Sequence, residues 1–127
     1  MQKPVLELTP WTLAVFRLEP FEDLPSWVVK GDFYSVTRTN EELSYVVPVS
    51  RIPEGIKTSN CWKAIKVQGP LDFSQTGILS AIAVPLAEAG ISIFAISTFD
   101  TDYILIKEET VDRAISVLKT SGYTINV

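Results

Sequence analysis

The chain has 127 residues, 46% of them apolar and 10% aromatic, with a net charge of -4, one cysteine and no histidine. This composition suits a soluble globular protein of one domain or two very small ones; it weighs against nucleic acid, which needs a basic patch, and against a membrane span, which needs roughly 20 apolar residues. Without histidine the commonest general base and metal ligand are absent, and a single cysteine excludes an internal disulfide, so we expect a cytoplasmic, non-catalytic protein without metal or cofactor.

The first half of the chain predicts an irregular, strand-rich unit. A β-rich run comes first, and the two prolines after it leave room for only one or two helical turns. Two further β-rich runs around Asn40 and Glu41 predict a hairpin. The predicted segments are a strand over Thr12–Leu18, turns within Pro20–Trp27, strands over Phe33–Thr39 and Leu43–Val49, and a short helix within Ser50–Asn60.

The second half is more regular. Apolar residues recur at helical spacing before Gly90 and before Gly122, and glycine is common just after a helix ends. Pro85 lies inside the first of these helices, where we expect a bend. The predicted segments are strand Cys61–Gln68, helix Gln75–Ala89, strands Ile91–Thr98 and Tyr103–Lys107, a helix from about Glu109, and strand Tyr123–Val127. This β-α-β-β-α-β order predicts a ferredoxin-like α+β fold.

The two hairpins match each other when the first is shifted by 60 residues, so that Asn40 meets Asp100. The surrounding order of strand, helical segment, hairpin and helical segment also recurs, which favours a duplication. We therefore expect two units in tandem, each with an antiparallel sheet and helices packed on one face. The first spans residues 1–60 with degenerate helices, and the second spans residues 61–127.

The first candidate site is the helix start within D-F-S-Q-T-G-I-L, Asp72 to Leu79. A helix N-terminus has unpaired N–H groups that hold carboxylates or phosphates, and Gly77 lets a ligand approach the backbone. The alternative is an ordinary capped helix with Ser74 or Thr76 as N-cap, which is the commoner arrangement.

The second candidate site is the polar stretch between two apolar runs, I-S-T-F-D-T-D-Y-I-L-I. Asp100 and Asp102 suit a cation or a ligand amine, or alternatively a solvated turn in which Asp bonds its own backbone. Two acids are too few for calcium, which takes six or more oxygens, so we expect no metal site here. Cys61 has no basic neighbour in the sequence and is interpreted as a packed thiol.

The segment Thr76 to Ile106 resembles an ACT domain of the sub-type found in aspartokinases and in the CASTOR family of cytosolic arginine sensors. The G-I-L-S helix start, the P-L-A-E-A-G-I-S helix end and the S-T-F-x-x-D-Y-I-L hairpin carry the likeness. The whole chain is also similar to small bacterial proteins built of two such units.

The resemblance implies a regulatory module that binds an amino acid or similar small molecule at an interface between ACT units, here in a homodimer. It implies that Asp102 suits a guanidinium or ammonium group, since opposite charge and a hydrogen bond reinforce each other. The residues that it assigns to the ligand are Gly77, Ile78 and Leu79 on the carboxylate side, and Thr98, Phe99 and Asp102 on the other side.

Two other functions stay open from the sequence. One is a protein–protein interaction module whose ligand site is degenerate, with sheet edges or helices that bind another protein. The other, more remote, is an enzyme that uses Asp102 or Tyr103.

Overall fold

The computed structural model describes residues 3–58, 61–68 and 77–127, which form two compact units. Unit 1 comprises the described residues of the ranges 1–10 and 63–127, and unit 2 comprises those of 11–62. Unit 1 is therefore discontinuous in sequence, because the first residues of the chain cluster with its second half. No helix among the described residues is long and apolar enough to cross a membrane.

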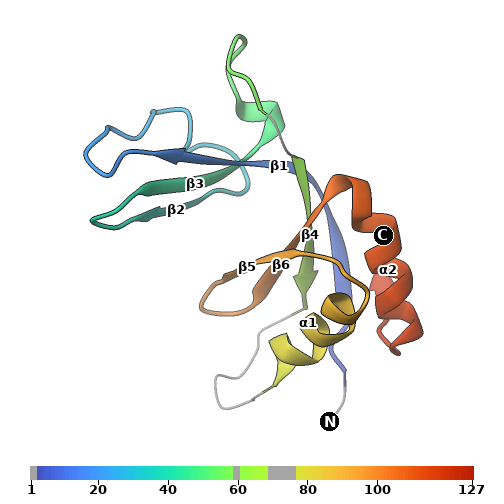
Figure 1. Ribbon diagram of the computed structural model, residues 1–127. Helices are drawn as coiled ribbons and strands as arrows, with labels where there is room; N and C mark the ends of the chain where they lie inside the picture. The colour runs from blue at the N-terminus through green and yellow to red at the C-terminus, as the bar shows by residue number, and fades with distance from the viewer. Residues whose placement is uncertain (1–2, 59–60, 69–76) are drawn as a thin grey trace. The chain divides into compact units, whose positions relative to one another are not determined.

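Unit 1 has the β-α-β-β-α-β order predicted from the sequence (Figure 1). Its helix α1 begins at Ile78, and residues 75–76 of the predicted helix lie outside the described residues. Its elements are β4 (Cys61–Val67), α1 (Ile78–Glu88), β5 (Ile93–Ser97), β6 (Asp102–Lys107), the 3-10 turn η2 (Glu108–Thr110), α2 (Val111–Thr120) and β7 (Ile125–Asn126).

The sheet of unit 1 contains one strand that the sequence did not predict there. The first half of β1 (Leu6–Leu18) lies between β4 and β7, so the strand order is β7-β1-β4-β6-β5. Strands β1 and β7 pair in parallel, with Leu6 opposite Ile125. The predicted strand began at Thr12, because Pro10 and the polar residues around it read as a break.

Both helices of unit 1 pack on one face of its sheet (Figure 1). Alternate residues of a strand point to the same face, and those of β4 and β6 that face the helices are fully buried. The core consists of strand residues Leu6, Ile65, Val67, Ile104 and Ile106 with helix residues Ile82, Leu86, Val111, Ala114 and Leu118, closed by Ile91, Tyr123 and Ile125.

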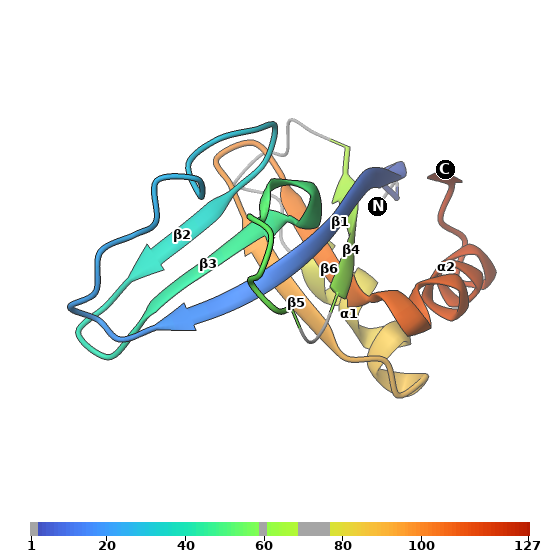
Figure 2. The same ribbon diagram turned by 90° about the horizontal axis from the view of Figure 1, so that it is seen from above.

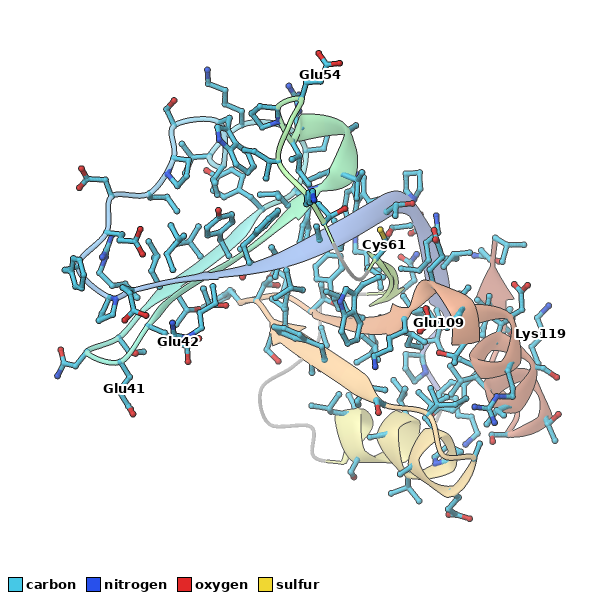
Figure 3. All side chains as sticks on the ribbon, turned by 45° about the horizontal axis from the view of Figure 1, so that its top comes forward. Glu41, Glu42, Glu54, Cys61, Glu109 and Lys119 are labelled. Carbon is cyan, nitrogen blue, oxygen red and sulfur yellow. The ribbon has the colours of Figure 1, made fainter. Side chains whose placement is uncertain are left out.

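The helix ends follow the sequence signals. Gly90 and Gly122 adopt φ values of 73° and 99° just after α1 and α2, in the left-handed region that glycine enters without steric cost. Glu109 precedes α2 and Lys119 lies in its last turn (Figure 3), which places each charge where the helix dipole favours it.

Unit 2 is an antiparallel three-stranded sheet in the order β2-β3-β1 (Figure 2). Strands β2 (Ser35–Arg38) and β3 (Leu43–Pro48) form the predicted hairpin, and the 3-10 turn η1 (Val49–Arg51) follows. Its core is aromatic: the rings of Phe16 and Tyr45 stack at 5.1 Å, and Trp27 meets both edge-on. Within the described part of unit 2 there is no α-helix, and Pro20–Trp27 is a series of turns.

Candidate functional site

The helix-start candidate is built on Gly77, which is the N-cap residue of α1. Its φ of 79° is left-handed, and its carbonyl accepts bonds from the Ala81 N–H at 2.9 Å and the Ser80 hydroxyl at 3.3 Å. The N-cap residue is thus a glycine, which has no side chain to cap the helix. The predicted N-cap residues, Ser74 and Thr76, lie outside the described residues.

The next two candidate residues, Ile78 and Leu79, are half-buried and pack against the core of unit 1. Gly77 itself is exposed, and a methyl group added there would meet nothing closer than the Ser80 hydroxyl at 3.9 Å. Apolar packing of Ile78 and Leu79 thus holds the first turn of α1, while Gly77 is exposed to solvent. The backbone N–H groups of a first helical turn suit a carboxylate.

The hairpin candidate is a tight turn organised by Thr98. The N–H of Thr98 donates to the carbonyl of Thr101 at 2.8 Å. The Thr98 hydroxyl donates to the same carbonyl at 3.1 Å and accepts from the Thr101 N–H at 3.2 Å. Hydroxyl bonds of this kind stabilise turns locally. The turn therefore needs neither glycine nor asparagine, and most of the bonding capacity of Thr98 is used within it.

The β2–β3 hairpin of unit 2 uses the same device. The N–H of Thr39 donates to the carbonyl of Glu42 at 2.9 Å, and the Thr39 hydroxyl accepts from Glu41 and Glu42 at 3.1 and 3.2 Å. Figure 3 shows Glu41 and Glu42 at this hairpin tip. Two hairpins in one chain thus share a threonine-based turn.

The strand pairing shifts the expected match between the hairpins by one residue. Arg38 pairs with Leu43 before the first turn, and Ser97 pairs with Asp102 before the second, so the offset is 59 residues and not 60. A one-residue change exchanges the two faces of a strand. In the corrected match Thr98 corresponds to Thr39, and Asp102 corresponds to a leucine that is 1% exposed.

With this match, the residues of the β5–β6 hairpin fall into a turn-forming threonine and an aspartate with another role. Thr98 and Thr39 hold the same position in their turns, whereas Asp102 has no acidic counterpart in the β2–β3 hairpin. Phe99 is 79% exposed at the tip, and Asp100 beside it is also exposed. Asp102 is therefore the residue whose presence the shared turn does not explain.

Asp102 is held by its partner across the hairpin. The Ser97 hydroxyl donates to Oδ1 of Asp102 at 2.5 Å. Because side chains alternate along a strand, Asp102 lies on the same face of the sheet as Ile104 and Ile106, which is the face that the helices cover. The carboxylate is half-buried, so a bound cation there would be partly shielded from water.

The hairpin is also tied to the neighbouring strand by a residue that the sequence did not single out. The hydroxyl of Thr101 donates to the carbonyl of Val67, the last residue of β4. β4 ends at this point, and the next described element, α1, begins just after Gly77. The structure thus places Thr98, Phe99 and Asp102 on one hairpin, and Gly77, Ile78 and Leu79 on the first turn of α1.

The chemistry offered by these residues is that of recognition. A carboxylate, hydroxyls and the N–H groups of a helix start can bind an amine, a guanidinium or a carboxylate. Among residues 3–58, 61–68 and 77–127, no cluster of three acidic or cysteine side chains is placed to hold a metal ion. Cys61 is a free, half-buried thiol at the start of β4 (Figure 3).

Comparison with known proteins defines the class. A family model of the ACT domain matches residues 57–120, and a second model, described only as an N-terminal domain, matches residues 12–55. The chain belongs to the ACT domain family. Subunit 1 of the cytosolic arginine sensor for mTORC1 is 42% identical in the human and bovine proteins and 39% in mouse, over 59 residues. These residues are 46% of this chain and 18% of those curated relatives.

Solved structures share the fold over nearly the whole chain. A protein from Agrobacterium tumefaciens is similar with a TM-score of 0.88 and 34% identity, covering 98% of this chain and 93% of that one. A protein of unknown function from Vibrio cholerae has a TM-score of 0.74 at 21% identity, covering 91% and 88%. Aspartokinase, solved as α and β subunits, has a TM-score of 0.60 at 17% identity, covering 94% and 98%.

Proposed function

We propose that this protein is a non-catalytic regulator that binds an amino acid at the end of its ACT domain where α1 begins and the β5–β6 hairpin turns. The observation that carries the proposal is the Ser97–Asp102 pair, which presents a half-buried carboxylate held by a hydroxyl. Such a carboxylate binds a cationic group strongly, because the charge attraction and the hydrogen bond add.

The proposed ligand has a cationic side chain. Asp102 receives its guanidinium or ammonium group, and the exposed backbone at Gly77, with Ile78 and Leu79 behind it, receives its carboxylate. Thr98 and Phe99 line the hairpin side. The curated relatives named above are arginine sensors, which makes L-arginine the first ligand to test.

Isothermal titration calorimetry tests the proposal with L-arginine, L-lysine and L-citrulline, the last a neutral analogue that keeps the shape of arginine. We expect binding of a cationic amino acid, about tenfold weaker binding of its neutral analogue, and a similar loss in Asp102→Asn. Asp100→Asn is the matched control, since it removes a carboxylate two positions away at the exposed tip. Failure of the wild-type protein to bind any of the twenty amino acids would refute the proposal.

Three finer proposals rest on the family resemblance. The protein is a homodimer, it works in the cytoplasm, and residues 1–60 form a degenerate ACT unit ahead of the ACT domain at 61–127. The threonine turn shared by Thr39 and Thr98 supports the duplication. Sedimentation velocity tests the dimer, and a single monomeric species at micromolar concentration would contradict it.

A second candidate function is protein–protein interaction through the loop at residues 19–25. Phe21 is 82% exposed there, although the loop is held in place by Arg38, whose guanidinium donates to the carbonyls of Pro20 and Glu22. An exposed aromatic side chain on a fixed loop is a common interface anchor. A stoichiometric partner that is lost with Phe21→Ala, together with no amino-acid response, would favour this function.

A further inference from the structure

Among the described residues, the buried polar side chains are those of two threonines, Thr9 and Thr101. Thr9 is 5% exposed and Thr101 is 6% exposed. Each donates its hydroxyl to a carbonyl of β4: Thr9 to Ala64 at 3.0 Å, and Thr101 to Val67. A buried hydroxyl needs a partner, and both have one within unit 1.

The two threonines differ in where they tie β4. Thr9 lies in β1 and bonds to Ala64, inside the strand. Thr101 lies in the hairpin turn, next to Asp102, and bonds to Val67 at the very end of β4. The next described element after β4 is α1, which begins just after Gly77. Thr101 therefore ties the hairpin part of the proposed site to the end of β4, the element that precedes α1 in the chain.

Thr101 also closes the turn itself. Its carbonyl accepts from both the N–H and the hydroxyl of Thr98, and its own N–H donates to that hydroxyl. With the bond to Val67, Thr101 takes part in four hydrogen bonds, three inside the turn and one outside it. Phe99 and Asp100, which lie between the two threonines, are exposed.

We infer that Thr101 is a positioning residue for the ligand site, which it serves by fixing the hairpin tip to the end of β4. Hairpin ends open more easily than the body of a sheet, and a site on a mobile tip loses affinity because the tip must be ordered on binding. The hydroxyl of Thr101 keeps the adjacent Asp102 carboxylate in place before the ligand arrives. This inference rests on the proposed function, since it names a residue that sets the affinity of the same site.

The experiment compares Thr101→Val with Thr9→Val, which removes the equivalent bond from the middle of β4, and with Thr101→Ser, which keeps the hydroxyl. Amide hydrogen exchange of Thr98 and Thr101 is measured by NMR on the full chain without ligand. The affinity for L-arginine, or for whichever amino acid the wild-type protein binds, is measured by calorimetry.

We expect Thr101→Val to speed exchange of the turn amides by about tenfold relative to Thr9→Val, and to weaken binding by about fivefold. Thr101→Ser should restore both, and Thr9→Val should leave the affinity unchanged while lowering overall stability. Equal turn exchange in the two valine variants, or unchanged affinity in Thr101→Val, would overturn the inference. If the wild-type protein binds no amino acid, the proposed function fails, and the ligand-free exchange rates still decide whether Thr101 anchors the tip.

Discussion

The hydroxyl of Ser97 donates to Oδ1 of Asp102 at 2.5 Å. These two residues form the pair of β5 and β6 that lies next to the turn. The bond fixes the direction of the carboxylate. It engages Oδ1 of the carboxylate, and we propose Oδ2 as the oxygen that accepts a ligand donor.

Replacement of Ser97 by alanine should weaken binding of a cationic amino acid by about two- to fivefold, because the carboxylate loses the bond that orients it. Calorimetry measures this change. Ser116→Ala on the exposed face of α2 is the control and should bind as the wild-type protein does. Tighter binding by Ser97→Ala would show that the serine competes with the ligand.

Thr98→Val and Thr39→Val should each lower the free energy of unfolding by about 1 kcal/mol, since each removes the hydroxyl that organises a hairpin turn. The serine variants at both positions should lose much less. Urea denaturation gives the values. If Thr98→Val instead left stability unchanged and abolished ligand binding, its hydroxyl would serve the ligand and not the turn.

Gly77→Ala and Gly90→Ala should destabilise the protein by similar amounts, about 1–2 kcal/mol each. Both glycines have left-handed φ values, 79° and 73°, and a methyl group meets no close neighbour at either. The two variants thus match in backbone strain and differ only in which end of α1 they change. Gly77→Ala alone should weaken ligand binding; equal affinities in both variants would remove Gly77 from the site.

Alkaline pH should destabilise the protein in a way that depends on Tyr45 and Tyr123. Burial raises the pKa of both phenols above the ordinary value of 10.0, and the Glu22 carboxylate raises the pKa of Tyr45 further. The unfolded chain then loses these protons first, so the free energy of unfolding falls as pH rises above about 10.

Tyr45→Phe and Tyr123→Phe should each reduce this slope, and the double variant should reduce it most. Chemical denaturation between pH 8 and about 11 measures it. A slope that persists unchanged in the double variant would assign the alkaline loss to other groups.

The sequence predicted the elements of unit 1 well, because its helices carry regular apolar spacing and end at Gly90 and Gly122. It did not predict that the first strand extends back to Leu6 and pairs with β7. A pairing between the two ends of a chain leaves no local pattern, and Pro10 argued against a continuous strand.

The candidate site was predicted in part. The residue types of the hairpin were recognised, but their repeat was misaligned by one position, since T-R-T-N-E-E and S-T-F-D-T-D are both mostly polar. The strand pairing of each hairpin and the hydrogen bonds of Thr39 and Thr98 decide the register. Thr101 was missed because a threonine in a polar turn looks solvated until its burial is known.

The insertion of β1 between β4 and β7 affects how the molecule can be dissected and how it folds. A fragment that starts at the apparent domain boundary near residue 61 would lack Leu6 from its core and would expose a bare edge on both β4 and β7. Leu6 and Ile125, which pair in this sheet, are 119 residues apart, so the sheet closes only through a long-range contact that forms slowly. Deletion of residues 3–10 should therefore destabilise the ACT domain, because it removes Leu6 from the core.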